Sequence, residues 1–300
     1  MSLTPLDKDA IRSSFDRAAS SYDQHAVLQR EIESRLLERI EFQRREPAMI
    51  LDLGCGTGSA SRTLAGQFPQ ASVIALDWAP AMLAKAGEAY GAEHGSTFGF
   101  SRLCADMHAL PLAARSADLV FSSLALQWSY DLAAIFREFR RIMKADAMLV
   151  FTCFGPDTLH ELKQAWRAVD NLPHVNDYPD MHDIGDELQA AGFRDPVMDT
   201  ERLTLEYPDV LSLMHELKGI GAHNVASKRL HGLTGKNRLQ GMLQAYEAFR
   251  RGNRYPASYE IIYGTAFSPR DGQPVKTPGG DVATFSVDAL RKRTRKGKPA

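Results

Sequence analysis

The pattern of apolar and polar positions changes character near residue 49. Before it, apolar residues recur every four positions from Leu28 to Ile40, which predicts an amphipathic helix over residues 26–41. After it, short apolar runs alternate with amphipathic segments. A strand followed by a helix, repeated at this spacing, is typical of a parallel sheet with helices on both faces. We therefore expect an α/β fold.

The individual elements follow from the same pattern. The apolar runs predict seven strands, at 49–53, 73–77, 101–104, 118–123, 147–153, 197–206 and 259–267. The amphipathic segments predict helices at 58–67, 80–90, 132–143, 157–168, 180–191, 209–219 and 236–250. Thr4 followed by Pro5 is typical of one more helix start. Two of these helices fall between the last two strands, so we expect a helical insertion at about residues 206–255 that forms a lid.

Composition narrows the class of protein. The chain has 300 residues, of which 44% are hydrophobic and 24% charged, enough for one large domain with an insertion. It contains no apolar run near the roughly 18 residues that a membrane span needs, so we expect a cytoplasmic protein that does not bind membranes. The cysteines, Cys55, Cys104 and Cys153, are odd in number and widely spaced. This spacing disfavours both a disulfide framework and a metal site.

The net charge of −1 hides an asymmetry between the body of the chain and its end. Six of the 36 Lys and Arg residues lie in RKRTRKGK, 291–298, which leaves 30 bases and 37 acids in the first 290 residues. A solvated end is the commoner role of such a tail, and no other feature indicates nucleic-acid binding. We divide the chain into an N-terminal helical cap (1–45), a main α/β domain (46–267) that includes the insertion, and a disordered basic tail (268–300). The tail has at most a short turn near Phe285–Leu290.

The first candidate for chemistry is the glycine-rich stretch ILDLGCGTG. Asp52 ends a strand, and Gly54, Gly56 and Gly58 alternate strictly before a helix. Loop amides and the positive end of a helix bind polar groups of nucleotide-like cofactors. The dinucleotide fingerprint G-x-G-x-x-G has a different spacing, since Ser61 stands where a later glycine would be expected. Asp52 would repel a pyrophosphate but suits an ammonium group.

The pattern resembles motif I of the class I S-adenosylmethionine-dependent methyltransferases. This similarity implies their Rossmann-like fold, a mostly parallel seven-stranded sheet. The resemblance implies S-adenosylmethionine as cofactor and S-adenosylhomocysteine as product. It places Asp77, at the end of the second strand, on the ribose hydroxyls, and Asp106, after the third strand, on the adenine amino group. Further cofactor contacts are expected from Cys55, Trp78, Met82, Met107, Ser122, Ser123 and Leu124.

The exit of the fourth strand, DLVFSSLALQW, is where this class places residues that face the acceptor. Methyltransferases that need a base or a metal often carry an acid or a histidine here, whereas this chain has Gln127 and Trp128. A carboxylate acceptor is already ionised at neutral pH and needs no base. The stretch therefore favours a carboxylate acceptor, with Gln127 and Trp128 as substrate-facing residues and no metal.

A more specific resemblance covers about residues 8–267. The chain resembles the malonyl-acyl-carrier-protein O-methyltransferases of biotin synthesis. The segments that carry the resemblance are FDRAASSYDQHAVLQR, LDLGCGTG, SSLALQW, AWRAVDNLPHVN, ELKGIGAHN and RYPASYEIIYG. The family forms the methyl ester of a malonyl thioester, which primes pimeloyl synthesis for biotin.

This resemblance implies a malonyl-loaded acyl carrier protein as partner and an arginine that meets the malonyl carboxylate. Arg229 and Arg254 are the candidates for that clamp. Tyr22 stands where related enzymes fold an aromatic ring over the cofactor, and His25 and Arg30 are candidates for the methionine end. We expect a monomer.

Two basic elements are candidates for the face that binds the acidic carrier protein. One is the helix at 132–143, with Arg137, Arg140, Arg141 and Lys144 outward, and the other is the insertion, which we favour because it should cover the site. The acceptor also has rivals: another small carboxylic acid or a quinone precursor. A related assembly-factor hydroxylase is a further alternative, but its fourth-strand motif has a different residue at the position of Gln127. A nicotinamide dehydrogenase is disfavoured by Asp52 and by the spacing of the glycines.

Overall fold

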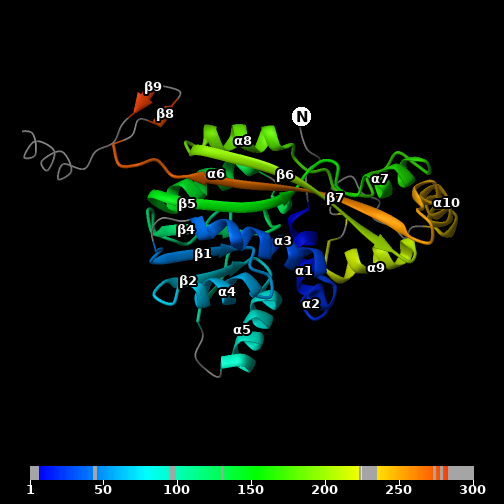
Figure 1. Ribbon diagram of the computed structural model, residues 1–300, viewed down its shortest axis with the longest axis horizontal. Coiled ribbons are helices and arrows are strands. Elements are labelled where there is room, and N and C mark those ends of the chain that lie inside the picture. The colour runs from blue at the N-terminus through cyan, green and yellow to red at the C-terminus, as the bar shows by residue number, and fades with distance from the viewer. Residues whose placement is uncertain are drawn as a thin grey trace, which may run out of the picture.

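The structure, a computed structural model, describes residues 7–42, 46–94, 99–129, 131–222, 224, 235–272, 275–277 and 280–282. Its centre is a seven-stranded sheet in the order β3-β2-β1-β4-β5-β7-β6 (Figure 1). The strands are β1 (Met49–Leu53), β2 (Ser72–Asp77), β3 (Ser101–Cys104), β4 (Ala117–Ser122), β5 (Met143–Phe154), β6 (Arg194–Tyr207) and β7 (Tyr255–Phe267). The β7 strand pairs antiparallel with both of its neighbours, whereas β1 to β5 pair in parallel.

Helices precede, connect and follow these strands. The N-terminal ones are α1 (Lys8–Ala18), α2 (Tyr22–His25) and α3 (Val27–Glu38), followed by a 3₁₀ turn at Arg39–Phe42. The connecting ones are α4 (Ser59–Gln67), α5 (Pro80–His94), α6 (Leu132–Ile142), α7 (His160–Arg167), α8 (Met181–Ala190), α9 (Val210–Gly219) and α10 (Lys236–Tyr246). Short 3₁₀ turns at Leu126–Trp128 and Glu247–Phe249 complete the set.

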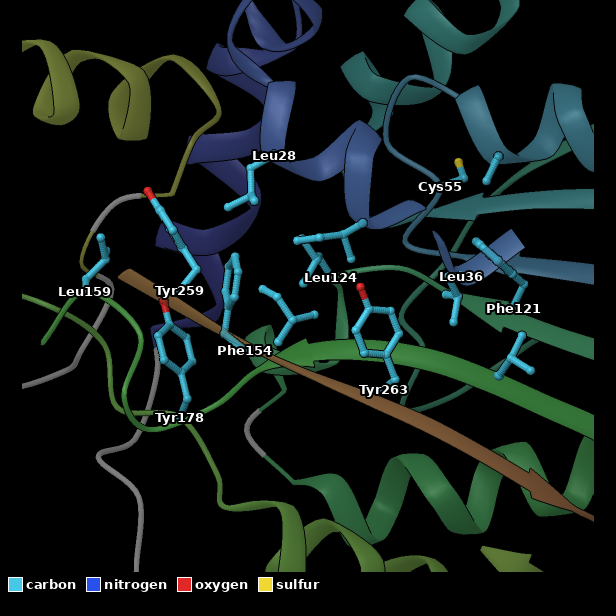
Figure 2. Close-up of a cluster of buried hydrophobic side chains, with 14 of the residues drawn as sticks. Leu28, Leu36, Cys55, Phe121, Leu124, Phe154, Leu159, Tyr178, Tyr259 and Tyr263 are labelled. Atoms are coloured by element: carbon cyan, nitrogen blue, oxygen red, sulfur yellow. The ribbon is translucent and has the colours of Figure 1, made fainter. Parts of the chain in front are cut away.

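The two faces of the sheet bury separate hydrophobic clusters, because successive strand residues point to opposite sides. In β5, Met148 and Val150 join the cluster that contains residues of α3, α4 and α5. Leu149 and Phe151 join the cluster built on α6 and α8. Figure 2 shows part of the first cluster, which continues from the sheet to aromatic side chains near α9. The sheet is thus covered by helices on both faces.

The long strands β6 and β7 carry the insertion past the edge of the sheet. Figure 1 shows α9 and α10 grouped with α7 at one end of these strands. The N-terminal helices reach the insertion through α2, where the hydroxyl of Ser21 donates to the carbonyl of Gly219 at 3.0 Å. Gly219 packs so tightly there that a Cβ would lie 2.2 Å from the ring of His25.

The fold class expected from the sequence is confirmed, including the seven strands, the N-terminal helices and the helical insertion between β6 and β7. The expected helix start at Thr4 lies outside the described residues, and the described part of α1 begins at Lys8, where the Asp7 carboxylate accepts from the amide of Ala10. The turn at Phe285–Leu290 and the basic stretch 291–298 also lie outside them.

Two features were not expected from the sequence. Tyr22–His25 forms the short helix α2, and Val275–Thr277 (β8) pairs with Gly280–Val282 (β9) in the segment expected to lack regular structure. Elements of three or four residues are too short to show the hydrophobic periodicity from which helices and strands are predicted. No helix in the described part of the chain is both long and apolar enough to cross a membrane.

Candidate functional site

The loop between β1 and α4 requires glycine for two different reasons. Gly54 has a φ of +74°, and a Cβ there would lie 2.3 Å from the Cβ of Ala125. Gly56 has a φ of +54°, and a Cβ there would contact the ring of Tyr22 at 3.9 Å. Gly54 thus allows the loop to pack against Ala125, and Gly56 gives it a backbone conformation that residues with side chains rarely adopt.

Two hollows meet at this loop. The Trp78 hollow is lined by Ile11, Phe15, Tyr22, Gly54, Gly56, Leu76, Asp77, Trp78, Met82, Ala105, Asp106, Met107, His108, Ser123, Leu124, Ala125 and Trp128. The Glu33 hollow is lined by Tyr22, Asp23, Ala26, Gln29, Arg30, Glu33, Asp52, Gly54, Cys55, Gly56, Thr57, Ser59, Ala60, Arg62 and Ser123. Each has about 720 Å³ of empty space including its mouth, a size typical of small-molecule sites. Four residues belong to both, so the hollows form one elongated site.

Asp52 is the most deeply buried acid of this site, with 1% of its surface exposed. Burial, together with the nearby carboxylates of Glu33 and Asp77, raises the pKa of Asp52 to about 7, although the hydroxyl of Ser61 donates to it at 2.5 Å. Burial also raises the pKa of Glu33. Carboxylates placed this way stabilise a cationic group that enters the Glu33 hollow.

Asp77 holds the glycine loop in place from the end of β2. One of its oxygens accepts from the amide of Gly56 at 2.9 Å, and the other accepts from the amide of Ala79 at 2.8 Å. Burial raises the pKa of this carboxyl as well, while these hydrogen bonds favour its ionised form. Asp77 therefore shapes the loop and offers its remaining lone pairs to a ligand in the Trp78 hollow.

Tyr22 covers the junction of the two hollows. Burial and the nearby acids Glu33 and Asp77 raise the pKa of its phenol far above neutrality. The side chain consequently stays protonated at physiological pH, so it can orient a ligand and exclude water but cannot serve as a general base.

The far end of the Trp78 hollow is organised by Asp106 and His108. Asp106 accepts from the backbone amide of His108 at 2.9 Å and lies 2.6 Å from its Nδ1, while Nε2 of His108 lies 3.1 Å from the hydroxyl of Ser129. Trp128 packs edge-on against Phe15 of α1, with ring centroids 5.2 Å apart. This end thus combines one oriented carboxylate with flat apolar walls, which suits a heteroaromatic ring.

The outer end of the Glu33 hollow carries the opposite charge. Arg30 donates to the carbonyl of Asp23 at 2.5 Å, and Arg62 donates to the carbonyl of Thr57 at 3.0 Å. Both arginines line the hollow. The hollow therefore offers carboxylates inside and guanidinium groups outside, the complement of an amino-acid zwitterion.

The structure brings most of the residues expected from the sequence to these walls. Those that line a hollow are Tyr22, Asp52, Gly54, Cys55, Gly56, Asp77, Trp78, Met82, Asp106, Met107, Ser123, Leu124 and Trp128. Gly58 and Ser122 support the loop instead, as the residue before α4 and as a buried donor to the carbonyl of Leu53 at 2.8 Å. Gln127 is buried and donates to the carbonyl of Leu124 at 2.7 Å, outside both hollows.

Of the two candidate clamp arginines, the structure describes only Arg254. Arg254 is exposed in the turn before β7, where Arg251 and Arg254 bridge through their backbones, and it lines neither hollow. Arg229 lies outside the described residues. His25 packs against Gly219 rather than in a hollow.

Sequence reasoning missed Glu33, Arg62, Phe15 and His108. Glu33 and Arg62 lie on helices whose amphipathic pattern identifies the buried stripe but not which polar residues border a hollow. For His108 the sequence did offer a local signal. An Asp side chain often accepts a hydrogen bond from the backbone amide of the second residue after it, so Asp106 could have been expected to contact His108.

Comparisons with known proteins place this site in a family. Residues 51–151 match the methyltransferase domain family. The malonyl-[acyl-carrier protein] O-methyltransferase of Gallionella capsiferriformans is 48% identical over 278 residues, covering 90% of this chain and 96% of that protein. The enzyme of the same name from Methylovorus is 47% identical, covering 88% and 90%. This chain belongs to the malonyl-[acyl-carrier protein] O-methyltransferase family.

Solved structures agree with the methyltransferase fold. YcgJ protein from Bacillus subtilis superposes with a TM-score of 0.55 at 14% identity, covering 78% of this chain and 98% of that one. Phosphoethanolamine N-methyltransferase 2 of Haemonchus contortus, in complex with S-adenosyl-L-methionine, has a TM-score of 0.52 at 18% identity, covering 85% and 57%. The fold expected from the glycine motif is thereby confirmed.

Proposed function

We propose that this methyltransferase transfers the methyl group of S-adenosylmethionine to the free carboxylate of a malonyl thioester on an acyl carrier protein. The observation that carries the proposal is the pair of hollows that meet at the glycine loop, in a chain nearly half identical to enzymes of that name. The products are the malonyl methyl ester and S-adenosylhomocysteine. A role in biotin synthesis stays a prediction from the sequence.

The walls of the two hollows fit this cofactor part by part. Asp106, Trp78 and Met107 suit adenine, and Asp77 suits the ribose hydroxyls. In the Glu33 hollow, Asp52 and Glu33 suit the ammonium group, while Arg30 and Arg62 suit the carboxylate. When bound, the cofactor supplies an electrophilic methyl group on a sulfonium centre. These residues hold and orient its two ends, which leaves the junction near Tyr22 for the acceptor.

The junction also fits a nucleophile that needs no deprotonation. The residues shared by both hollows are Tyr22, Gly54, Gly56 and Ser123, a set without histidine, lysine or carboxylate. Tyr22 remains a neutral phenol, as its raised pKa requires. A carboxylate acceptor is ionised already, so positioning and exclusion of water are the tasks left to these residues.

A mass measurement tests the proposal directly. Incubated with S-adenosylmethionine, malonyl-loaded carrier protein is expected to gain one methyl group, whereas acetyl-loaded carrier protein, which lacks the free carboxylate, gains none. Methylation of a free dicarboxylate but of neither carrier protein would refute the proposed acceptor.

The pKa of Asp52 predicts how cofactor affinity depends on pH. The carboxyl titrates near pH 7 in the free protein, and a bound ammonium group favours its ionised form. Protonation therefore competes with binding, so the dissociation constant should rise by up to about tenfold per pH unit below pH 7 and level off above it. Isothermal titration from pH 5.5 to 8.5 measures the profile. Asp52→Asn should bind more weakly with a flat profile, and an unchanged slope in this variant would assign the proton elsewhere.

The carrier protein is acidic, which favours a basic docking face near the insertion. Arg250, Arg251 and Arg254 are exposed together in the turn before β7. On α6, Arg141 is hydrogen-bonded to Glu138, and Lys144 at the start of β5 is paired with Asp118. In the turn, Arg250 is paired with Glu247 at 3.5 Å, so the argument for this face rests on Arg251 and Arg254. We therefore assign docking, rather than the inner clamp, to the turn that contains Arg254.

Charge reversal distinguishes these two faces. Arg251→Glu with Arg254→Glu should raise KM for malonyl-carrier protein about tenfold at low salt and less at high salt, because surface charges are screened. KM for malonyl-pantetheine, which lacks the carrier protein, should not change. Arg137→Glu on α6 is the matched substitution, and if it has the larger effect, α6 is the docking face.

A further inference from the structure

A third cavity lies beside the cofactor site and is assigned to no step so far. This Tyr178 cavity is lined by Gln29, Phe154, Thr158, Leu159, Leu162, His174, Val175, Asn176, Tyr178, Leu217, Ile220, Ala222, Asn224 and Tyr259. Its empty space is about 460 Å³. The walls come from α3, the end of β5, α7, the loop before α8, the end of α9 and β7. Segments far apart in the chain thus enclose one chamber.

The cavity adjoins the cofactor site through a single side chain. Gln29 of α3 lines both the Tyr178 cavity and the Glu33 hollow. Figure 2 shows Phe154, Tyr178 and Tyr259 gathered at one end of the buried cluster, with Leu28 and Leu124 drawn between them and Cys55 of the glycine loop. A molecule held in the cavity therefore has one end beside the Glu33 hollow, which leads on to the junction through Tyr22, Gly54 and Gly56.

The chemistry of the walls excludes some ligands and favours others. Among its lining residues as described there is no Asp, Glu, Lys or Arg. A carboxylate or phosphate that lies against these described residues would lose its hydration without meeting a counter-charge from them, which is unfavourable. Amide side chains, hydroxyls and aliphatic side chains are instead mixed along the walls. Such a lining suits a neutral chain in which amide groups alternate with methylene groups.

His174 is held rigidly in this wall. Its ring stacks on Trp166 with centroids 3.7 Å apart and an interplanar angle of 5°, and its Nε2 lies 2.9 Å from an oxygen of Asp170. With Nε2 occupied by Asp170, Nδ1 is the ring nitrogen left for a polar group of a ligand, such as an amide.

We infer that the Tyr178 cavity binds the thioester and the adjoining amide-containing pantetheine arm of the acceptor, an inference that rests on the proposed function. The arm is neutral along this part and combines amides with methylene groups, as the walls require. With the arm held there, the malonyl carboxylate extends past Gln29 toward the junction. His174 and Asn176 are then positioning residues, which fix the arm and do not touch the reacting atoms.

Filling the cavity from two different elements tests this assignment. Ala222→Trp and Val175→Phe, both at half-buried positions, should each raise KM for malonyl-pantetheine and for malonyl-carrier protein by about tenfold. The dissociation constant for S-adenosylmethionine and the melting temperature should stay near wild type. Leu211→Trp adds the same ring on the exposed side of α9, away from the cavity, and should behave as wild type.

The outcomes separate this inference from the proposed function. An unchanged KM for malonyl-pantetheine in both filled variants overturns the inference, as does an effect seen with the carrier protein alone. Binding of pantetheine itself, followed by NMR saturation transfer, should be lost in Ala222→Trp and kept in Leu211→Trp. If wild type methylates neither malonyl substrate, the proposed function fails, and this binding comparison still decides whether the cavity takes the arm.

Discussion

Replacing Asp77 by asparagine is expected to weaken S-adenosylmethionine binding about 100-fold. The carboxylate accepts from two loop amides, of Gly56 and Ala79, whereas an asparagine offers one oxygen and one NH₂ group. One amide N–H would then face a donor, and the charge that favours the ribose hydroxyls would be lost. Losses of about 1.5–3 kcal/mol for a charged hydrogen bond account for an effect of this size. Isothermal titration measures it.

Asp118 provides a matched control for that substitution. It also accepts from two backbone amides, those of Ala48 and Met49, at 3.1 and 2.9 Å, but it lines neither hollow. Asp118→Asn should lower the melting temperature and leave cofactor affinity unchanged. Equal losses of affinity in both variants would mean that the effect of Asp77 is a general one on the fold.

Gly54→Ala is expected to remove cofactor binding and to destabilise the protein by about 3 kcal/mol or more. The new Cβ would lie 2.3 Å from that of Ala125, and the φ of +74° is unfavourable for any residue with a side chain. Relief of this overlap requires the loop to move away from the start of the Leu126–Trp128 turn. Chemical denaturation measures the free energy of unfolding, and titration measures the affinity.

Gly66→Ala is the control for this substitution. Gly66 lies in α4, and a Cβ there would meet no atom within 4 Å. Alanine is the better helix former by about 1 kcal/mol, so this variant should be slightly more stable and bind the cofactor normally. A destabilised Gly66→Ala, or a Gly54→Ala of wild-type affinity, would contradict the steric argument.

Much of the site could be predicted from the sequence because topology brings distant acids together. Asp52 and Asp77 lie at the carboxyl ends of β1 and β2, and Asp106 follows β3; the carboxyl ends of parallel strands meet at one sheet edge. Local apolar patterning was enough to find those strands. The edge strand β6 was less clear, since acids and arginines interrupt its alternation, and it proved longer than expected, as did its partner β7.

The rest depends on packing that no local pattern records. Glu33 enters the hollow because α3 packs across the sheet, and Tyr178 faces Phe154 only after the segment that follows α7 folds back. The third cavity has walls from six separate segments, so it exists only in the folded chain. Gln127 illustrates the converse, because its position suggested an acceptor contact and its side chain instead supports the turn that carries Leu124.

The hydrogen bond from Ser21 to Gly219 connects the cofactor site to the third cavity. It ties α2, which carries Tyr22, to the end of α9, where Leu217 and Ile220, the residue after the helix, line the third cavity. Gly221, two residues after Gly219, also packs closely on the N-terminal helices. Its φ is +75°, and an added Cβ there would lie 3.1 Å from the carbonyl oxygen of Ser14. Because this hydrogen bond joins α2 to the end of α9, we expect the wall of the cofactor site that contains Tyr22 and the wall of the third cavity that contains Leu217 to move together.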